Sequence, residues 1–160
     1  MLVWRICKQR HVSNAFSGVG AEKLGGRWNH KGERMLYTST SLSLAAIELF
    51  VHLEPNCIPY DLHAVIATIP DIVSTEKLSP TELPRNWRDY PAPARLQEIG
   101  SRWLRERRSC ALVVPSAVNP EEHNVLINPL HPEAARISDF ESKPFQFDPR
   151  MWKSARATKS

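Results

Sequence analysis

The segment "RMLYTSTSLSLAAIELFVHL", residues 34–53, begins with a pattern typical of a strand and continues with a pattern typical of a helix. Its first six residues, "RMLYTS", are predicted to form a strand, whose period of two places Met35, Tyr37 and Ser39 on one face. In the remainder, apolar residues recur at every third or fourth position, which predicts an amphipathic helix. A strand that passes directly into a helix predicts a fold that combines both kinds of element.

The rest of the chain adds further short strands and a second helix. Apolar runs bounded by proline or polar residues predict strands at 2–7, 63–70, 110–116 and 123–129, and near 145–147. A second amphipathic helix is predicted at 94–108, with its inward face formed by Leu96, Ile99, Trp103 and Leu104. We therefore predict a single α+β domain over residues 1–150, with five or six short strands and two main helices. A basic tail follows at 151–160, with no assigned role, and its composition is compatible with disorder.

Five of the six glycines of the chain lie in "SNAFSGVGAEKLGGRWNHKGE", residues 13–33. Glycine weakens both helices and strands, so this stretch is predicted to be mostly loop. Loops of this length inside a compact domain are often functional. We therefore expect it to contribute to a ligand site.

The composition limits the classes of function. Hydrophobic residues make up 42% of the chain and charged residues 24%, as in ordinary globular proteins. No apolar run approaches the roughly 20 residues of a membrane span, and charge appears too early for a secretory signal. We therefore expect a cytoplasmic protein with no membrane partner. The net charge of +4 fits an anionic small substrate or an acidic protein equally well.

The cysteines and histidines do not form a metal-binding pattern. Cys7, Cys57 and Cys110 are widely spaced and form no C-x-x-C pair, so they are predicted to be small buried apolar residues. Glu48 and His52 could supply two metal ligands, but the sequence shows no third. We expect no metal.

Two side chains near the glycines could bind parts of a ligand. Arg27 follows "LGG" and precedes Trp28 and Asn29, and its guanidinium could hold a phosphate or a carboxylate through two parallel hydrogen bonds. The alternative is a surface arginine in a turn. Tyr37 could stack on a planar ring such as nicotinamide, or it could simply pack in the core.

Glu48 is the most informative residue of the predicted helix. At about 100° per residue it falls beside the stripe that we expect to be buried, on the flank shared with Leu44 and His52. The predicted stripe itself consists of Leu42, Ala45, Ala46, Leu49 and Leu53. A carboxylate there could bind a sugar hydroxyl or stabilise a cationic sugar transition state. The alternative is a partly exposed carboxylate that pairs with His52.

Several polar residues follow or end the later strands. Ser116 comes directly after a predicted buried strand, where side chains often line clefts, but the G-x-S-x-G pattern of a nucleophile elbow is missing. A serine that forms a turn is the alternative, and Asn124 and Asn128 have the same ambiguity. His131 is expected to be structural.

Taken together, "WR" near the start, "GGRWN", "LYTSTSLSLAAIE", "VVPS" and "HNVLINPLHP" resemble the RES domain, over roughly residues 3–140. This domain is the toxin half of the RES–Xre class of bacterial toxin–antitoxin systems. The resemblance implies a fold like that of ADP-ribosyltransferases of the diphtheria-toxin type, with a mixed β-sheet core and flanking helices. It also implies that NAD is the substrate and that the bond between nicotinamide and ribose is cleaved.

The resemblance assigns roles to particular residues. Arg27, Tyr37 and Glu48 match the catalytic arginine, tyrosine and glutamate of the family, with Arg27 on the NAD phosphates, Tyr37 on the nicotinamide and Glu48 on the ribose. The remaining residues that would line the NAD site are Trp28, Asn29, Ser39, Ser116 and Asn124. Inorganic phosphate is a possible second substrate, since family members degrade NAD by hydrolysis or phosphorolysis.

The resemblance also implies an Xre-like antitoxin that blocks the active site, with nucleic acid contacted only through that partner. Whether the toxin forms a homodimer within the complex is left open. The E-x-E or Q-x-E pair of many ADP-ribosyltransferases is missing around Glu48, which favours NAD breakdown over modification of a protein. Two alternatives remain: an ADP-ribosyltransferase that modifies a specific host protein, and a non-catalytic module that binds nucleic acid through "RWLRERR".

Overall fold

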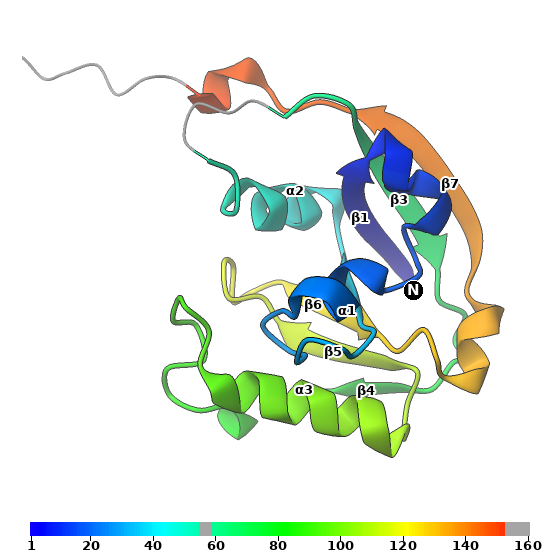
Figure 1. The fold of residues 1–160 in the computed structure, drawn as a ribbon, viewed down its shortest axis with the longest axis vertical. Helices are drawn as coiled ribbons and strands as arrows, with labels where there is room; N and C mark the ends of the chain where they lie inside the picture. Colours follow the sequence, from blue (N-terminus) through cyan, green and yellow to red (C-terminus); the bar gives the residue numbers. More distant parts are fainter. Residues whose placement is uncertain (55–58, 153–160) are drawn as a thin grey trace, which may run out of the picture.

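The computed structural model describes residues 1–54 and 59–152, and they form one seven-stranded sheet with helices packed on it (Figure 1). The strand order across the sheet is β4-β5-β6-β2-β1-β3-β7. The strands are β1 (Leu2–Lys8), β2 (Leu36–Ser39), β3 (Leu62–Thr68), β4 (Thr75–Lys77), β5 (Ala111–Pro115), β6 (His123–Ile127) and β7 (Ser138–Phe145). Only β4 and β5 run parallel, so the sheet is mixed and the predicted α+β class is confirmed.

The sheet consists of two halves that meet between β1 and β2. Full antiparallel ladders join β1 to β3 and β2 to β6. In contrast, β1 and β2 pair only at Trp4 and Ser39. In the rest of this junction, the Arg5 guanidinium donates a hydrogen bond to the backbone carbonyl of Tyr37 at 3.1 Å. A side chain therefore occupies a place where a continuous ladder would have backbone bonds.

The described residues contain three α-helices and four 3-10 segments in addition to the strands. The helices are α1 (Val19–Leu24), α2 (Leu42–Phe50) and α3 (Ala94–Glu106). The 3-10 segments are Gln9–Asn14, Pro80–Glu82, Pro132–Arg136 and Pro149–Trp152. Helix α3 lies along the half of the sheet that contains β4, β5 and β6, whereas α2 packs against β1 and β2 (Figure 1). No helix in the described ranges is long and apolar enough to cross a membrane.

The core is divided between the two faces of the sheet. On one face, Leu96, Trp103 and Leu104 of α3 pack against Leu112 and Leu126 of the sheet. A second cluster lies on the other face and consists mainly of Val3, Leu36, Ala67, Ile69, Val125, Ile127 and Ile137. The alternation of β2 sends Leu36 to the second cluster and the ring of Tyr37 to the first.

Most of the predicted elements are confirmed, but the last strand was misplaced and one strand was not predicted. The last strand begins at Ser138 and ends at Phe145, earlier than the predicted position near 145–147. Strand β4 was not predicted, because three residues with mixed exposure carry no periodic signal. The stretch at 13–33 is mostly loop, as predicted, but it also contains the short helix α1, which has no buried residue.

The buried face of α2 is turned toward Glu48 relative to the predicted stripe. Leu44, which was placed on the flank with Glu48, has no exposed surface, and Ala45 is also buried. Leu42 and Leu49, by contrast, are only partly buried. Ser41 caps the helix by accepting a hydrogen bond from the Leu44 amide at 3.1 Å. The Glu48 flank therefore faces into the molecule.

The end of the described chain folds back onto α2. Trp152, within the predicted tail 151–160, packs edge-to-face on Phe50 with ring centroids 5.4 Å apart. The rest of that tail, 153–160, lies outside the described residues, as does Cys57.

Candidate functional site

The carboxylate of Glu48 is fixed by two side chains from the neighbouring half of the sheet. The Ser116 hydroxyl, just after β5, donates to Glu48 Oε1 at 2.7 Å. The side-chain amide of Asn124, on β6, donates to the same oxygen. Hydrogen bonds to an ionised carboxylate are stronger than bonds between neutral groups, so this pair holds the carboxylate in one orientation.

Each of these two donors is itself held by the protein. Ser39 on β2 donates from its hydroxyl to Asn124 Oδ1 at 2.7 Å, which fixes the amide with its nitrogen toward Glu48. The Ser116 hydroxyl oxygen accepts from the amides of Val118 at 3.1 Å and Asn119 at 3.0 Å. The predicted site residues Ser39, Glu48, Ser116 and Asn124 therefore form one network, which we call the Glu48 network.

The other carboxylate oxygen of Glu48 is not used by the network. Among the described residues, both hydrogen bonds to this side chain end on Oε1, and Oε2 has no hydrogen-bond donor. The side chain is partly exposed, so Oε2 can be reached by a ligand. An oriented carboxylate with one free oxygen can accept a hydrogen bond from a sugar hydroxyl.

The turn at 25–30 forms the second part of the site. Tyr37 holds it from β2, since the phenol donates to Asn29 Oδ1 at 2.7 Å and accepts from the Trp28 amide at 3.0 Å. The Asn29 amide, fully buried, donates to the carbonyls of Ala21, His30 and Glu33. The buried polar groups of the turn thus satisfy one another, which rigidifies it.

Residues of helix α3 also hold the turn at 25–30 in place. Gln97 donates to the carbonyls of Gly26 at 3.0 Å and Asn29 at 3.3 Å. A Cβ at Gly100 would lie 1.9 Å from the Trp28 carbonyl oxygen, so only glycine allows this approach. A Cβ at Gly26 would lie 2.5 Å from the Tyr37 hydroxyl. The turn is therefore packed tightly between α3 and β2.

Arg27 projects from this turn toward a loop between Pro80–Glu82 and α3. Its guanidinium donates to the carbonyls of Trp87 at 2.7 Å and Asp89 at 3.1 Å. Burial lowers the pKa of Arg27, and the negative charge of Glu48 is the largest effect that opposes this shift. The cation on the turn and the carboxylate of the Glu48 network therefore share one electrostatic environment.

Tyr37 has a different arrangement from the one expected for a ring that stacks on a ligand. Burial raises the pKa of its phenol, and both hydrogen-bonding functions of the hydroxyl are taken by the turn. The phenol therefore stays protonated and positions the residues that flank Arg27. Its contact with a ligand stays a prediction.

Other polar candidates lie away from the carboxylate. Asn128 donates to the Leu104 carbonyl at 3.2 Å and accepts from the Leu130 amide at 3.1 Å, so it closes a turn. His131 caps the 3-10 segment Pro132–Arg136 by accepting from the Glu133 amide. Trp28 is buried against α3 and contributes its backbone rather than its ring.

The cysteines described by the structure offer no activated thiol. Cys110 is fully buried, and burial raises its pKa to about 11. Burial also raises the pKa of Cys7, which is partly exposed. Across residues 1–54 and 59–152, no cluster of three or more His, Cys, Asp or Glu side chains could hold a metal ion.

Three residues of the site were missed by the sequence analysis. Gln97 and Gly100 hold the turn from α3, and the glycine in the middle of an amphipathic helix was a signal of close backbone approach. Arg5 lies at the junction of the two sheet halves, where burial lowers its pKa. The presence of Arg5 in the otherwise largely apolar strand predicted at 2–7 could have indicated this junction.

A separate hollow of about 400 Å³ is lined by Asn128 but by none of the residues assigned to the NAD site. Its rim carries the ion pairs Arg34–Glu22 at 3.0 Å and Arg105–Glu33 at 3.0 Å.

Comparisons with known proteins identify the family of this chain. A family model described as "RES domain" matches residues 2–148. Toxin Res of Yersinia enterocolitica serotype O:8 is 38% identical over 152 residues, which are 94% of this chain and 99% of the relative. The Prs ADP-ribosylating toxin of Sphingobium sp. is 38% identical over 156 residues, which are 95% of this chain and 97% of the relative.

A solved structure shares the fold. The toxin–antitoxin complex MbcT–MbcA of M. tuberculosis contains a chain that superposes with a TM-score of 0.71 and 16% identity. The superposition covers 98% of this chain and 89% of the other. The family match over nearly the whole length is decisive: this chain belongs to the RES-domain family.

Proposed function

We propose that this protein is the toxin of a toxin–antitoxin pair and that it cleaves the bond between nicotinamide and ribose in NAD. The observation that carries the proposal is the Glu48 carboxylate, oriented by Ser116 and Asn124 through Oε1 and free at Oε2. Curated relatives named Toxin Res and Prs ADP-ribosylating toxin support the same reading.

The chemistry requires a group that stabilises a positively charged sugar. When the C1′–N bond breaks, its electron pair leaves with nicotinamide, which becomes neutral, and the ribose becomes an oxocarbenium ion. A fixed carboxylate beside the ribose hydroxyls favours that charge and needs little reorganisation. Glu48 supplies the carboxylate, and Ser39 supports it indirectly through Asn124.

Arg27 is the residue that would bind the diphosphate of NAD. It is permanently charged, and its present hydrogen-bond partners are backbone carbonyls of Trp87 and Asp89. A diphosphate is a stronger acceptor than a carbonyl, so the substrate can replace one or both of these bonds. Holding the diphosphate fixes the distance between the ribose and Glu48, and such positioning lowers the barrier.

The oxocarbenium ion must then react with a nucleophile. Water would give ADP-ribose, inorganic phosphate would give ADP-ribose-1″-phosphate, and each transfers its proton to solvent after attack. We favour these acceptors, because the residue two positions before Glu48 is Ala46, which cannot direct a protein nucleophile as the acidic or amide residue of many transferases does.

A second candidate function is ADP-ribosylation of a protein. The name of the Sphingobium relative, Prs ADP-ribosylating toxin, favours it, because 95% of this chain aligns with that protein. The first step is the same as in NAD breakdown, and only the nucleophile differs. A nucleic-acid-binding module has less support, since Arg105 and Arg108 of "RWLRERR" pair with Glu33 and Glu76.

We also propose an antitoxin that covers the Glu48 network, of the Xre-like kind. An unrestrained enzyme of this activity would deplete the NAD of its own cell, and the structural neighbour was solved as a toxin–antitoxin complex. The proposed partner is a protein, NAD is the only small substrate besides phosphate, and the proposed mechanism uses no metal.

The experiment is to incubate the purified protein with NAD, with and without inorganic phosphate, and to separate the products by chromatography. Nicotinamide together with ADP-ribose identifies hydrolysis, and ADP-ribose-1″-phosphate formed only with phosphate identifies phosphorolysis. Label transferred from NAD to a protein band identifies the second candidate. Absence of nicotinamide under all of these conditions would overturn the enzymatic proposal.

The role of Glu48 is tested in the same assay with Glu48→Gln and a matched control, Glu121→Gln. Glutamine keeps the size of the side chain but removes its charge, and we expect nicotinamide release to fall by about 100-fold or more. Glu121 is exposed and lies outside the network, so its variant should retain full activity. Equal activity of the two variants would remove Glu48 from the mechanism.

A further inference from the structure

We infer that His52 and Tyr90 form an aromatic clamp that holds one flat ring of the dinucleotide at the edge of the site. This inference rests on the proposed function. The two rings are far apart in sequence but their centroids are 6.3 Å apart, with 54° between the ring planes. Both side chains are exposed, Tyr90 to 81%. Because both rings are exposed, their contact buries little surface and contributes little to the free energy of unfolding.

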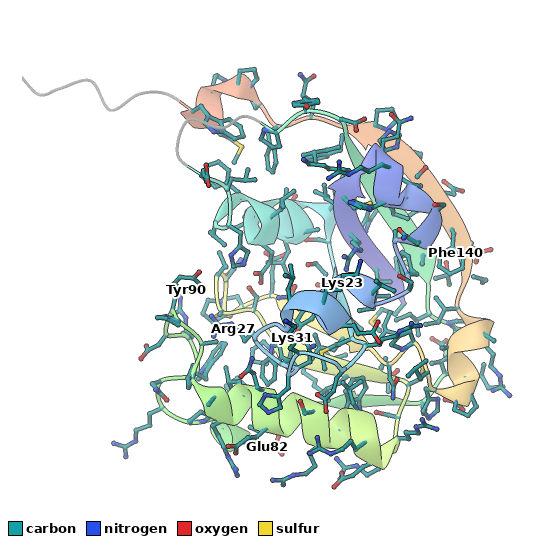
Figure 2. All side chains as sticks on the ribbon, in the orientation of Figure 1. Lys23, Arg27, Lys31, Glu82, Tyr90 and Phe140 are labelled. Carbon is teal, nitrogen blue, oxygen red and sulfur yellow. The ribbon has the colours of Figure 1, made fainter. Side chains whose placement is uncertain are left out.

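The clamp adjoins both charged groups of the proposed site. His52 follows Glu48 by four residues and lies in the turn just after α2 ends at Phe50, where its amide donates to the Leu49 carbonyl at 3.1 Å. Tyr90 directly follows Asp89, whose carbonyl accepts from Arg27. Figure 2 shows Tyr90 and Arg27 on the same side of the molecule, in the region between α2 and α3.

The loop that carries Tyr90 is fixed by its backbone while the ring itself is free. Arg27 binds the carbonyls of Trp87 and Asp89, and the Arg88 guanidinium donates to the Ala117 carbonyl at 3.1 Å. Ala117 is the neighbour of Ser116, so the same loop is tied to the Glu48 network. The protein thus holds the backbone at residue 90 in place and presents an aromatic side chain to solvent.

A planar ligand would have to displace the present contact between the two rings. At 6.3 Å and 54° the rings of His52 and Tyr90 are in contact with each other. A ring between two stacked groups needs about 7 Å from one outer ring to the other, twice the contact distance of about 3.5 Å between carbon atoms. The exposed Tyr90 ring must therefore move away from His52 and turn parallel to it to admit a base. Stacking is tolerant of the ring, so adenine and nicotinamide share the required chemistry.

The test compares Tyr90→Ala, His52→Ala and Tyr90→Phe with a matched control, Tyr60→Ala. Tyr60 is 83% exposed and forms no hydrogen bond or aromatic pair with the described site residues, so it controls for the loss of a surface tyrosine. The first measurement is kcat and KM for nicotinamide release from NAD. The second is calorimetric binding of ADP-ribose and of nicotinamide mononucleotide to each variant in the Glu48→Gln background.

We expect the alanine variants to raise the KM for NAD by about fivefold to a hundredfold with little change in kcat. Tyr90→Phe should behave like the wild type, because it keeps the ring. Weaker binding of ADP-ribose alone would identify adenine as the ring in the clamp. Weaker binding of nicotinamide mononucleotide alone would identify nicotinamide.

Wild-type parameters in both alanine variants, with cleavage of NAD intact, would overturn the clamp and leave the proposed function standing. A loss in Tyr60→Ala as large as in Tyr90→Ala would also overturn it, because the effect would then be unspecific. If the wild type neither binds nor cleaves NAD, the proposed function fails and the clamp fails with it.

Discussion

The Ser116 hydroxyl donates a hydrogen bond to Glu48 Oε1 at 2.7 Å, although the two residues are 68 positions apart in the sequence. The serine is fully buried and receives two backbone amide bonds on its oxygen. The hydroxyl hydrogen is thereby directed at the carboxylate. Ser116, which the sequence analysis placed in the lining of the site, therefore holds the Glu48 carboxylate in one orientation.

Replacing Ser116 by alanine should affect both stability and activity. The amides of Val118 and Asn119 would lose their acceptor, which we expect to lower the free energy of unfolding by about 2 kcal/mol. Glu48 would keep only the Asn124 donor, and kcat for nicotinamide release should fall by about tenfold. Urea unfolding and the product assay measure the two effects.

The control for this variant is Ser43→Ala, on the exposed side of α2. We expect it to leave kcat unchanged. An activity loss in Ser116→Ala as large as in Glu48→Gln would instead identify Ser116 as directly catalytic.

Replacing Tyr37 by phenylalanine should destabilise the protein and change its response to high pH. The Trp28 amide and Asn29 Oδ1 lose their partner, which should cost about 1–3 kcal/mol. Burial raises the pKa of Tyr37 above its ordinary value of 10.0, so the folded protein keeps a proton that the unfolded chain loses.

The contribution of that proton is therefore fully present below pH 10 and declines as the pH rises above it. The wild type should lose stability in alkaline solution more steeply than Tyr37→Phe. Urea unfolding of both proteins at about pH 8 and about pH 11 gives this difference. Parallel losses in the two proteins would contradict a protonated, buried phenol.

Two glycine substitutions should have opposite effects. Gly100→Ala places a Cβ 1.9 Å from the Trp28 carbonyl oxygen, so α3 or the turn must move, and we expect a loss of about 3 kcal/mol. Gly20→Ala in α1 meets no atom within 4 Å and should stabilise the protein by about 0.5–1 kcal/mol. Thermal unfolding measures both, and a stable Gly100→Ala would contradict the tight packing of the turn.

Arg27→Lys should weaken NAD binding more than it slows the chemical step. Lysine keeps the charge but cannot bind two acceptors with the planar geometry of the guanidinium. We expect KM to rise by about tenfold with a smaller change in kcat. Arg95→Lys on the exposed side of α3 is the matched control. An equal change in both variants would assign the effect to surface charge.

The sequence predicted the parts of the fold that have a regular period. Strand β2, helix α2 and helix α3 were placed within a few residues, because each buries one face of a repeating pattern. The Glu48 flank was also identified, since a carboxylate beside an apolar stripe is unusual.

The remaining features depend on contacts between distant segments. The position of β4 depends on a parallel ladder with β5, and three residues cannot show a period. The orientation of Glu48 depends on Ser116 and Asn124, which no local pattern connects to α2. The occupied hydroxyl of Tyr37 depends on how the turn at 25–30 folds, which the glycines allow but do not determine.

The single backbone pair between β1 and β2 has a mechanical consequence. Trp4 and Ser39 form the single residue pair between β1 and β2. Rotation of one half of the sheet about this pair therefore breaks few backbone hydrogen bonds. Glu48 lies on α2, which packs against β1 and β2, whereas Ser116 and Asn124 belong to the half that contains β5 and β6. A molecule that separates the two halves would move the Glu48 carboxylate away from Ser116 and Asn124. It would thereby inactivate the site without binding in it.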